Sequence, residues 1–391
     1  MWIRNSKLFY ILLVIYYGWF QIVFYQIPNM MLFLGSGMIY FILLHAIQSR
    51  INIFKSLTGE LKLWIVFAFT SFLFGLMVAV NKVYLINSVA TFVQFTILIF
   101  GIVYISNQDR KIDFFINVFI IFTLLCAVTT VFWGLDYGQG RITMGINNNP
   151  NELGITMVLG VGSILYKLNL KKLGYSIIAF SAILLLVYVC ILTGSRKAFI
   201  SIVLLIIYWL TFIVFKDIRA LRLTEKVKGI ISLLLIIGFA YFILVPNFND
   251  SVLILRLTNL FEFGDETRQN MYIEAFQFFK QSPLVGIGLN NFRAMSIYQG
   301  YSHSTYAETL ACTGIVGCIL YLSAYILIIF KYGKMVISNW DDFSLKQARI
   351  MLGIFGVLLF LGIGIIHFYE MTSSIAFGMI IAYNNINKHR K

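Results

Sequence analysis

The chain has 391 residues, of which 60% are hydrophobic and only 12% are charged. Soluble domains carry roughly 25% charged residues, so this composition excludes an ordinary soluble fold and predicts a protein embedded in a lipid bilayer. The net charge of +14 raises the question of a nucleic-acid partner, and the distribution of basic residues along the chain answers it.

Apolar segments recur along the whole chain, and a membrane-spanning helix needs about 20 such residues. We expect twelve spans, at residues 8–25, 30–47, 61–80, 84–105, 113–133, 153–168, 175–193, 198–215, 229–246, 306–330, 350–367 and 371–386. The predicted fold is one all-α integral membrane domain over residues 1–391, with a large extracytoplasmic loop at 247–305 that contains amphipathic helices. The first segment follows Arg4 and Lys7 and resembles a signal anchor without a cleavage site, so we expect it to stay attached.

The basic residues predict the orientation of these spans. With both termini in the cytoplasm, 22 of the 30 basic residues lie inside and 8 outside, whereas the acidic residues divide 7 inside and 9 outside. This is the positive-inside pattern, so topology and anionic inner-leaflet lipid explain the net charge and no nucleic-acid partner is expected. The eight outer basic residues oppose the pattern, and they are Lys82, Arg141, Arg196, Lys197, Arg256, Arg268, Lys280 and Arg293. For Lys82, Arg256 and Lys280 we expect solvated or snorkelling side chains.

The first outer motif runs from Arg141 to Gly154 and contains three asparagines before Pro150. A turn explains part of it, because Asn-Pro favours turns and Asn151 is suited to cap the next helix. A turn does not explain Arg141 or the number of amides, and clustered amides also suit sugar hydroxyls. Arg141 and Asn151 are therefore candidate substrate-binding residues.

The second outer motif is TGSRK at residues 193–197, where two apolar segments meet with almost no loop. A guanidinium near the bilayer surface is costly to place in lipid, and snorkelling of Arg196 is one solution. The alternative is that Arg196 faces a cavity and binds phosphate, which its planar fork matches with two hydrogen bonds. A helix beginning near Ala198 would favour the same anion, and Lys197 is a further binding candidate.

The third outer motif begins with residues 267–281, which predict an amphipathic helix on the membrane surface. Tyr272 lies on its apolar face and is a binding candidate, and Asp265 is suited to be its N-cap. Arg268 falls in the first turn, where anions are favoured.

The chain after this helix holds Gly286, Gly288, Arg293, His303 and Glu308. The two glycines predict a tight turn with close backbone approach, and without a preceding strand they are not a dinucleotide fingerprint. A lone His is most often a hydrogen-bonded packing residue. His303 stands at a helix start on the outer side, where its ordinary pKa near 6.5 lets it take a proton from a hydroxyl. Arg293 and Glu308 are binding candidates beside it.

Taken together, four motifs resemble the O-antigen ligase and polymerase superfamily. They are NNNPNELG at 147–154, TGSR at 193–196, an Arg-led helix followed by PLVGIGLNNF at 283–292, and HSTYAETLACTGIVG at 303–317. Their order and separations are similar to those of the family, and the resemblance covers the region from Arg141 to Gly317 and the twelve-span topology.

The resemblance implies transfer of a glycan from a polyprenyl (undecaprenyl) diphosphate carrier to an acceptor hydroxyl at the outer face of the bacterial cytoplasmic membrane. It implies inversion at the anomeric carbon, a GT-C-like architecture, and no metal, cofactor or nucleotide sugar. Arg196 and Arg268 would grip the diphosphate, and His303 would be the general base, whereas Arg141 aligns loosely. Many relatives have Asn where this chain has Ser304, so a neighbouring hydrogen bond is expected to differ.

The leading interpretation is a polymerase that joins lipid-linked repeat units into O-antigen, capsule or exopolysaccharide. The closest alternative is a ligase that transfers finished glycan to a lipid or protein acceptor. A flippase or secondary transporter is the alternative of another class, but its ionisable residues would lie at mid-membrane, whereas here they crowd the outer boundary. Expected partners are the glycan donor, the acceptor, membrane lipid, a chain-length regulator and a flippase.

Overall fold

The computed structural model describes residues 42–43, 47, 53–109, 112–144, 149–169, 173–214, 251–263, 265–337 and 345–388. The predicted spans at 8–25 and 229–246, and most of 30–47, lie outside these residues. The count of twelve spans, the GT-C-like architecture and the orientation therefore stay predictions.

The mostly helical fold is confirmed over the described part of the chain. Its elements are η3 (Ile53–Ser56), α3 (Gly59–Val78), α4 (Lys82–Asp109), α5 (Asp113–Trp133), β1 (Leu135–Gly138), β2 (Arg141–Thr143), α6 (Pro150–Lys167), α7 (Leu173–Leu192), α8 (Arg196–Trp209), η4 (Leu210–Val214), α11 (Val252–Phe263), α12 (Glu266–Gln281), α13 (Phe292–Met295), α14 (Thr305–Ile337), α15 (Lys346–Leu361), η6 (His367–Tyr369) and α16 (Met371–Lys388). Nine of the predicted spans overlap α3 to α8 and α14 to α16.

Six of the described helices are long and apolar enough to cross a membrane. They are Gly59–Val78, Lys82–Asn107, Asp113–Trp133, Gly174–Leu192, Arg196–Ile213 and Thr305–Val336. The predicted spans at 153–168, 350–367 and 371–386 form α6, α15 and α16, which fall short of that standard in length or apolarity. These three helices are largely buried by their neighbours.

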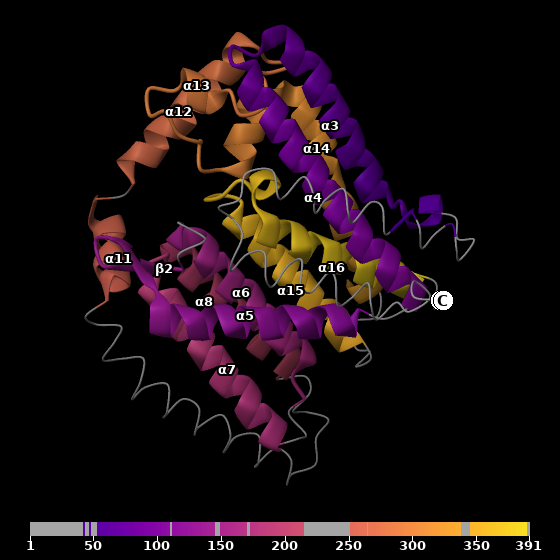
Figure 1. Cartoon of the computed structure of the whole chain (residues 1–391), viewed down its shortest axis with the longest axis vertical. Coiled ribbons are helices and arrows are strands. Elements are labelled where there is room, and N and C mark those ends of the chain that lie inside the picture. The colour runs from indigo at the N-terminus through magenta and orange to yellow at the C-terminus, as the bar shows by residue number, and fades with distance from the viewer. Residues whose placement is uncertain are drawn as a thin grey trace.

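Figure 1 shows two groups of helices with α15 and α16 between them. In one group α3 packs against α4 and α14, and in the other α6 packs against α5, α7 and α8. Small residues make α6 the centre of its group, because a Cβ at Gly160 would meet Thr123 Cγ2 at 2.4 Å and one at Gly162 would meet Ile354 Cγ1 at 2.8 Å. Such close approach strengthens van der Waals contact between helices in lipid, where apolar burial alone provides little driving force.

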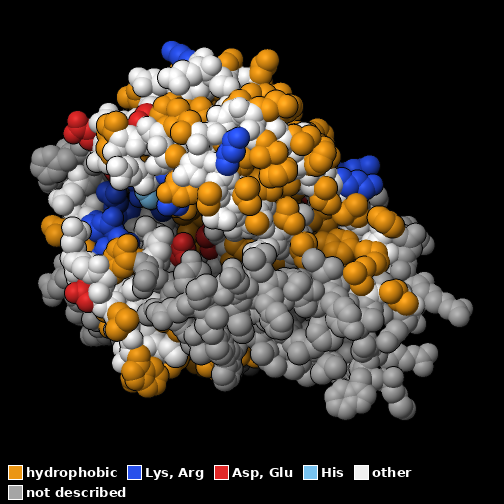
Figure 2. Space-filling model, turned by 45° about the horizontal axis from the view of Figure 1, so that its top comes forward, with side chains coloured by type: hydrophobic (Ala, Val, Ile, Leu, Met, Phe, Trp, Pro, Cys, Tyr) orange, Lys and Arg blue, Asp and Glu red, His pale blue; other side chains and the backbone are white. Residues whose placement is uncertain are grey.

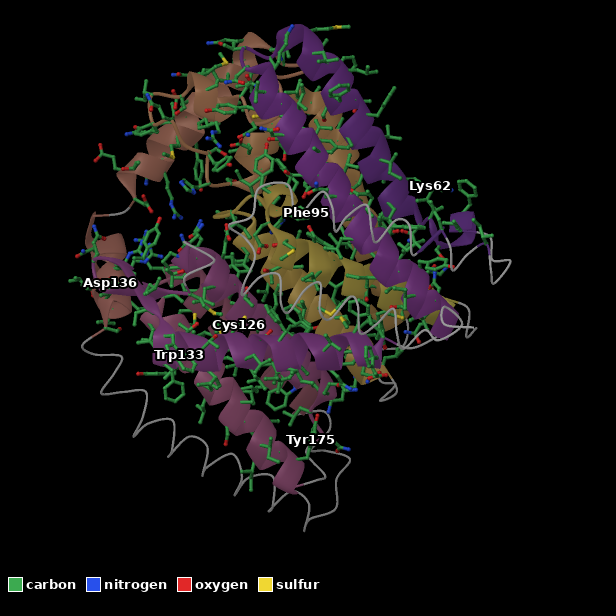
Figure 3. All side chains as sticks on the ribbon, in the orientation of Figure 1. Lys62, Phe95, Cys126, Trp133, Asp136 and Tyr175 are labelled. Carbon is green, nitrogen blue, oxygen red and sulfur yellow. The ribbon has the colours of Figure 1, made fainter. Side chains whose placement is uncertain are left out.

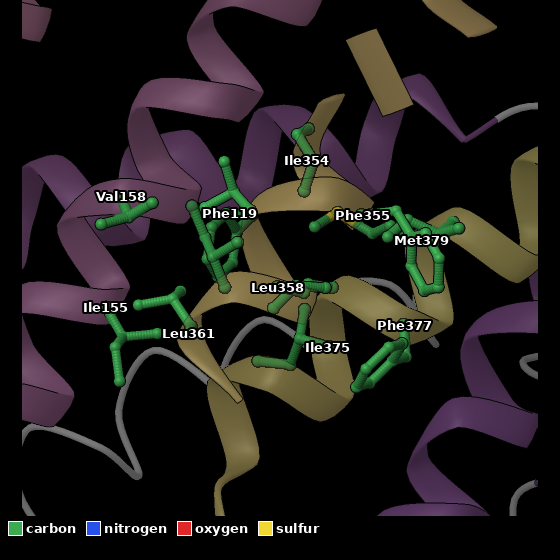
Figure 4. Packing of buried hydrophobic residues seen from close by; sticks show 14 of the residues in the cluster. Phe119, Ile155, Val158, Ile354, Phe355, Leu358, Leu361, Ile375, Phe377 and Met379 are labelled. Atoms are coloured by element: carbon green, nitrogen blue, oxygen red, sulfur yellow. The ribbon is translucent and has the colours of Figure 1, made fainter. Parts of the chain in front are cut away.

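The core that joins the two groups is apolar. Figure 4 shows Phe119, Ile155, Leu358, Ile375 and Phe377 close together, and each of these side chains is nearly inaccessible to solvent. They come from α5, α6, α15 and α16, so segments far apart in the sequence share one packed interior.

The small antiparallel sheet is the departure from an all-α fold. β1 and β2 pair with Leu135 opposite Thr143, and the turn between them places Gly138, Gln139 and Gly140 at positive φ. The hairpin packs against the start of α11, since a Cβ at Gly140 would lie 2.8 Å from a Val252 methyl group. Figure 3 marks Asp136 of this hairpin beside α11.

The close backbone approach predicted at Gly286 is confirmed. Gly286 has a φ of +69°, and a Cβ there would lie 2.4 Å from the carbonyl carbon of Cys312 in α14. The segment pairs with α14 through Ile287 N–H to Ala311 O at 3.1 Å. α14 is kinked at Gly314, where φ is +61° and ψ is −166°, so that it can accept this neighbour. The sequence analysis did not foresee that kink.

Candidate functional site

A cluster of positive charge lies in a hollow between the two helix groups. Figure 2 shows Lys and Arg side chains gathered on the left of the view with a His beside them, and Figure 3 shows nitrogen-bearing side chains between α11 and the lower end of α12. A pocket lies here, lined by Asn151, Ile155, Ser195, Arg196, Lys197, Ala198, Arg256, Arg268, Leu361, Gly364 and Ile365. Five separate segments contribute, namely α6, the start of α8, α11, α12 and the turn after α15.

Two arginines meet on one carboxylate in this region. Arg196 Nη2 lies 2.8 Å from Asp265 Oδ2, and Arg268 Nε lies 3.3 Å from the same oxygen. The side chains of Arg196 and Arg268 are only 13% and 22% exposed, so water screens their charge incompletely. The structure thus brings together the two arginines that the sequence analysis singled out for anion binding.

The helix that carries Arg196 begins earlier than predicted. α8 starts at Arg196 rather than near Ala198, and Gly194 turns the chain before it with a φ of +61°. The first-turn N–H groups of a helix have no partner within the helix and attract anions. Arg196, Lys197 and this helix start therefore offer positive charge to the same pocket.

Arg141 holds the turn at Thr193 and Gly194 that precedes α8. This buried side chain donates from Nε to Thr193 O at 2.9 Å and from Nη2 to Asn151 Oδ1 at 3.1 Å. Desolvation lowers the pKa of Arg141, and the positive charges of Arg196 and Arg268 lower it further, whereas Tyr137 opposes the change. Arg141 therefore fixes the backbone that presents Arg196 and adds its charge to the cluster.

Arg256 is one of the three outer basic residues for which a solvated or snorkelling side chain was expected. It lines the pocket and donates from Nη1 to Gly194 O at 2.7 Å, while its own carbonyl oxygen accepts from Arg196 Nη1 at 3.3 Å. Burial lowers the pKa of Arg256 to about 10, helped by the positive charges of Arg141, Arg196 and Arg268. Its only signal in the sequence was a positive charge on the predicted outer side.

The asparagine loop places its residues differently from the expectation. Asn149 rather than Asn151 caps α6, because the Asn149 side chain accepts from the Asn151 N–H at 3.0 Å. This leaves the Asn151 side chain free to line the pocket and to accept from Arg141.

A pair of acidic residues near this loop was not singled out from the sequence. Desolvation raises the pKa of Glu152 to about 7, and the negative charge of Glu370 raises it further, whereas Asn149 opposes the change. Glu370 accepts the Thr372 N–H at 3.1 Å and so caps α16, and burial raises its pKa. Glu152 is consequently partly protonated at neutral pH.

Lys197 crosses the turn after α15. A Cβ at Gly364 would lie 2.1 Å from both Cδ and Nζ of Lys197, so a larger residue there would displace the end of this side chain. The predicted span at 350–367 is interrupted here, because α15 ends at Leu361 and the chain turns to form the pocket wall.

His303 stands at the edge of the cluster on a constrained loop. Its φ is +56°, and the loop is held by Ser302 N–H to Glu308 Oε2 at 2.9 Å and by Thr305 N–H to Gly362 O at 2.8 Å. The His303 side chain keeps an exposed surface, but the surrounding atoms remove part of its hydration, and this lowers its pKa below 6.5. The charges of Arg268 and Lys197 lower it further, and Asp265 opposes them. The ring is therefore neutral at pH 7.

The remaining candidates lie around the pocket rather than in its lining. Glu308 is fully buried beneath the His303 loop. Arg293 donates to Tyr301 Oη at 3.1 Å and stacks 4.4 Å from the ring centroid of Tyr84. Tyr272 Oη donates to Ile363 O at 2.7 Å and ties α12 to the turn after α15. The Tyr272 bond thus joins two walls of the pocket, whereas Arg293 contacts Tyr301 and Tyr84 of α4.

Within the described ranges, no group of three or more His, Cys, Asp or Glu side chains is placed to hold a metal ion. The cluster instead offers fixed guanidinium groups, which suit an anion with several oxygens.

Comparison with known proteins adds one match. Residues 181–322 match a family model described as O-antigen ligase, over a little more than a third of the chain. The matched region includes Arg196, Arg268 and His303 and leaves out Arg141 and Asn151. No curated protein matches the chain. The match supports the resemblance to the O-antigen ligase and polymerase superfamily and indicates glycan transfer of that general kind; together with the six apolar helices, it indicates a membrane protein.

Proposed function

We propose that the protein is a membrane glycosyltransferase that moves a glycan from a polyprenyl diphosphate carrier to an acceptor hydroxyl at the outer face of the bacterial cytoplasmic membrane. The observation that carries the proposal is the meeting of Arg196 and Arg268 at one pocket, with Lys197 and Arg256 in the same lining. Three guanidinium groups around one small pocket suit the oxygens of a diphosphate. Burial beside Arg268 and Arg196 lowers the pKa of Lys197 to about 7, so its amine adds only part of a charge.

The donor chemistry needs this positive charge. The bond between the anomeric carbon and the phosphate oxygen breaks, and the lipid diphosphate leaves with the electron pair. Arg196 and Arg268 stabilise the charge that develops on the leaving oxygens. Before the donor binds, Asp265 holds both side chains, and the carbonyl group of Arg256 also holds Arg196. Fixed donors of this kind lower the barrier because little reorganisation remains to be done in the transition state.

The acceptor chemistry needs a base on the other side of the sugar. The acceptor oxygen forms the new bond to the anomeric carbon, and its proton passes to the neutral ring of His303. Attack opposite the leaving group inverts the anomeric centre. The paired carboxylates of glycoside hydrolases are not required, because the diphosphate already activates the donor.

The leading form of this activity is polymerisation of lipid-linked repeat units into surface polysaccharide. The ligase form is the second candidate, and the description of the matched family favours it. We propose cytoplasmic termini in both forms, with a flippase supplying donor and a chain-length regulator acting on the polymerase.

A glycan gel from a strain that lacks this chain tests both forms. Loss of the ladder with a single repeat still attached to its acceptor supports the polymerase, whereas unattached long glycan supports the ligase. An unchanged ladder with normal attachment would contradict both.

A further inference from the structure

Asp265 stands where an anionic ligand would bind. Its Oδ2 atom takes the Nη2 of Arg196 at 2.8 Å and the Nε of Arg268 at 3.3 Å. A phosphate gripped by both guanidinium groups would need those same N–H donors. The Asp265 side chain is 27% exposed, so a ligand entering the pocket can reach it and exchange with it.

A second observation indicates where this carboxylate can go. Asp265 is the N-cap residue of α12, but its side chain makes no capping hydrogen bond. Asp is among the preferred N-cap residues because its side chain accepts from the N–H groups of the first turn. The Asp265 carbonyl oxygen already accepts from the Arg268 and Gln269 N–H groups, so the helix start is formed and the carboxylate belongs to the residue directly before its first turn.

We propose that Asp265 is an internal competitor of the donor diphosphate. Diphosphate binding displaces the carboxylate from Arg196 and Arg268, and the released side chain caps α12. The exchange reverses when the lipid diphosphate leaves, so Asp265 weakens product retention as well as donor binding. This proposal rests on the proposed function, which assigns the pocket to a diphosphate.

The exchange of Asp265 for diphosphate can affect His303 through the helices that lie between them. α12 packs against α14, which begins directly after the His303 loop, and Tyr272 ties α12 to the turn that receives the Thr305 N–H. Capping stabilises the first turn of α12 and the helix N-terminus favours the negative charge. Donor binding would therefore order α12, the helix next to the segment that carries His303.

The test is binding of inorganic pyrophosphate to the purified full chain in lipid nanodiscs, with farnesyl diphosphate as the lipid-linked probe. Asp265→Asn keeps the size and capping ability of the side chain and removes its charge. Because each part-buried ion pair has a modest strength, we expect this variant to bind pyrophosphate roughly three- to tenfold more tightly. Glu266→Gln makes the same charge change one residue later at an exposed position, and its affinity should change by no more than about twofold.

Two outcomes separate the ideas. Weaker or unchanged pyrophosphate binding by Asp265→Asn overturns the competitor role and shows that the carboxylate positions the arginines. Unchanged binding by both Arg196→Ala and Arg268→Ala overturns the proposed function itself. Asp265→Ser, which can also cap α12 and carries no charge, gives the same comparison if the Asn variant does not fold.

A second measurement follows the released side chain. Pyrophosphate should slow hydrogen exchange at the Thr267 amide in the wild-type chain, because the Asp265 carboxylate then caps it, whereas the Arg268 amide is already bonded to the Asp265 carbonyl oxygen. The Asp265→Ala variant should lose this protection. Equal protection in both chains would contradict the capping step.

Discussion

Removing Arg268 or Arg196 is the most direct perturbation of the site. Loss of one preorganised donor to a developing anion costs about 3–4 kcal/mol, so Arg268→Ala and Arg196→Ala should each slow glycan transfer by roughly a hundred- to a thousandfold. Arg196 should show the larger effect, because its side chain is 13% exposed against 22% for Arg268. In the double variant, the rate of glycan transfer should fall by less than the product of the two single-variant decreases, since both guanidinium groups meet on Asp265.

The assay is turnover of purified lipid-linked glycan by the reconstituted protein, with thermal unfolding as a check on folding. Lys280→Ala is the matched control: it removes a positive charge from the same helix, at a position where Nζ lies 4.8 Å from the Phe276 ring centroid. The twelve residues between Arg268 and Lys280 correspond to about 18 Å of helix, so this control should stay within about twofold of wild type. Equal losses in Arg268→Ala and Lys280→Ala, or full turnover in the former, would refute the diphosphate assignment.

His303→Ala should bind donor normally and lose turnover by about a hundred- to ten-thousandfold, as measured by single-turnover kinetics; retained turnover would remove His303 as the base. Because the pKa of His303 is lowered, its neutral form predominates at pH 7, and kcat/KM should fall only as the pH drops through a value below 6.5. Donor charge beside Arg268 should raise that pKa, so the acid limb of kcat should lie at higher pH than that of kcat/KM; coincident limbs would count against this coupling. Gly286→Ala and Gly314→Ala should each destabilise the fold by at least about 2 kcal/mol in thermal unfolding, because a Cβ at either would lie 2.4 Å from backbone atoms at positive φ. Gly356→Ala, where nothing lies within 4 Å, is the control and should be nearly neutral.

The helix positions could be predicted from the sequence because the length of an apolar segment indicates whether it enters a bilayer or a protein core. α12 was placed to within a residue at each end. The same reasoning placed Arg196, Arg268 and His303 on the predicted outer side, each close to the start of a helix. Hydropathy alone does not say which partner, so the shared carboxylate of Asp265 could not be predicted.

The region 350–367 shows why composition misleads near a site. Its residues are apolar almost throughout, which favoured one continuous span, but α15 ends at Leu361 and a glycine-containing turn follows. The carbonyl groups freed at Gly362 and Ile365 both accept from Thr305 N–H. These bonds join segments about sixty residues apart, and only the packed structure brings donor and acceptor together.

Contacts between segments distant in the sequence also explain how so much positive charge is tolerated beside lipid. Four guanidinium groups and the Lys197 amine surround the Asp265 carboxylate, an arrangement whose mutual repulsion and lost hydration oppose folding and lower the pKa of Lys197 to about 7. Part of the compensation is backbone: the carbonyl groups of Thr193, Gly194 and Arg256 each accept from a guanidinium group. The single carboxylate neutralises only one charge, so the cluster keeps a net positive charge. A ligand with several negative oxygens would neutralise this positive charge, whereas a neutral sugar or an aliphatic chain would not. The charge of the pocket therefore selects the phosphate end of the donor rather than any sugar.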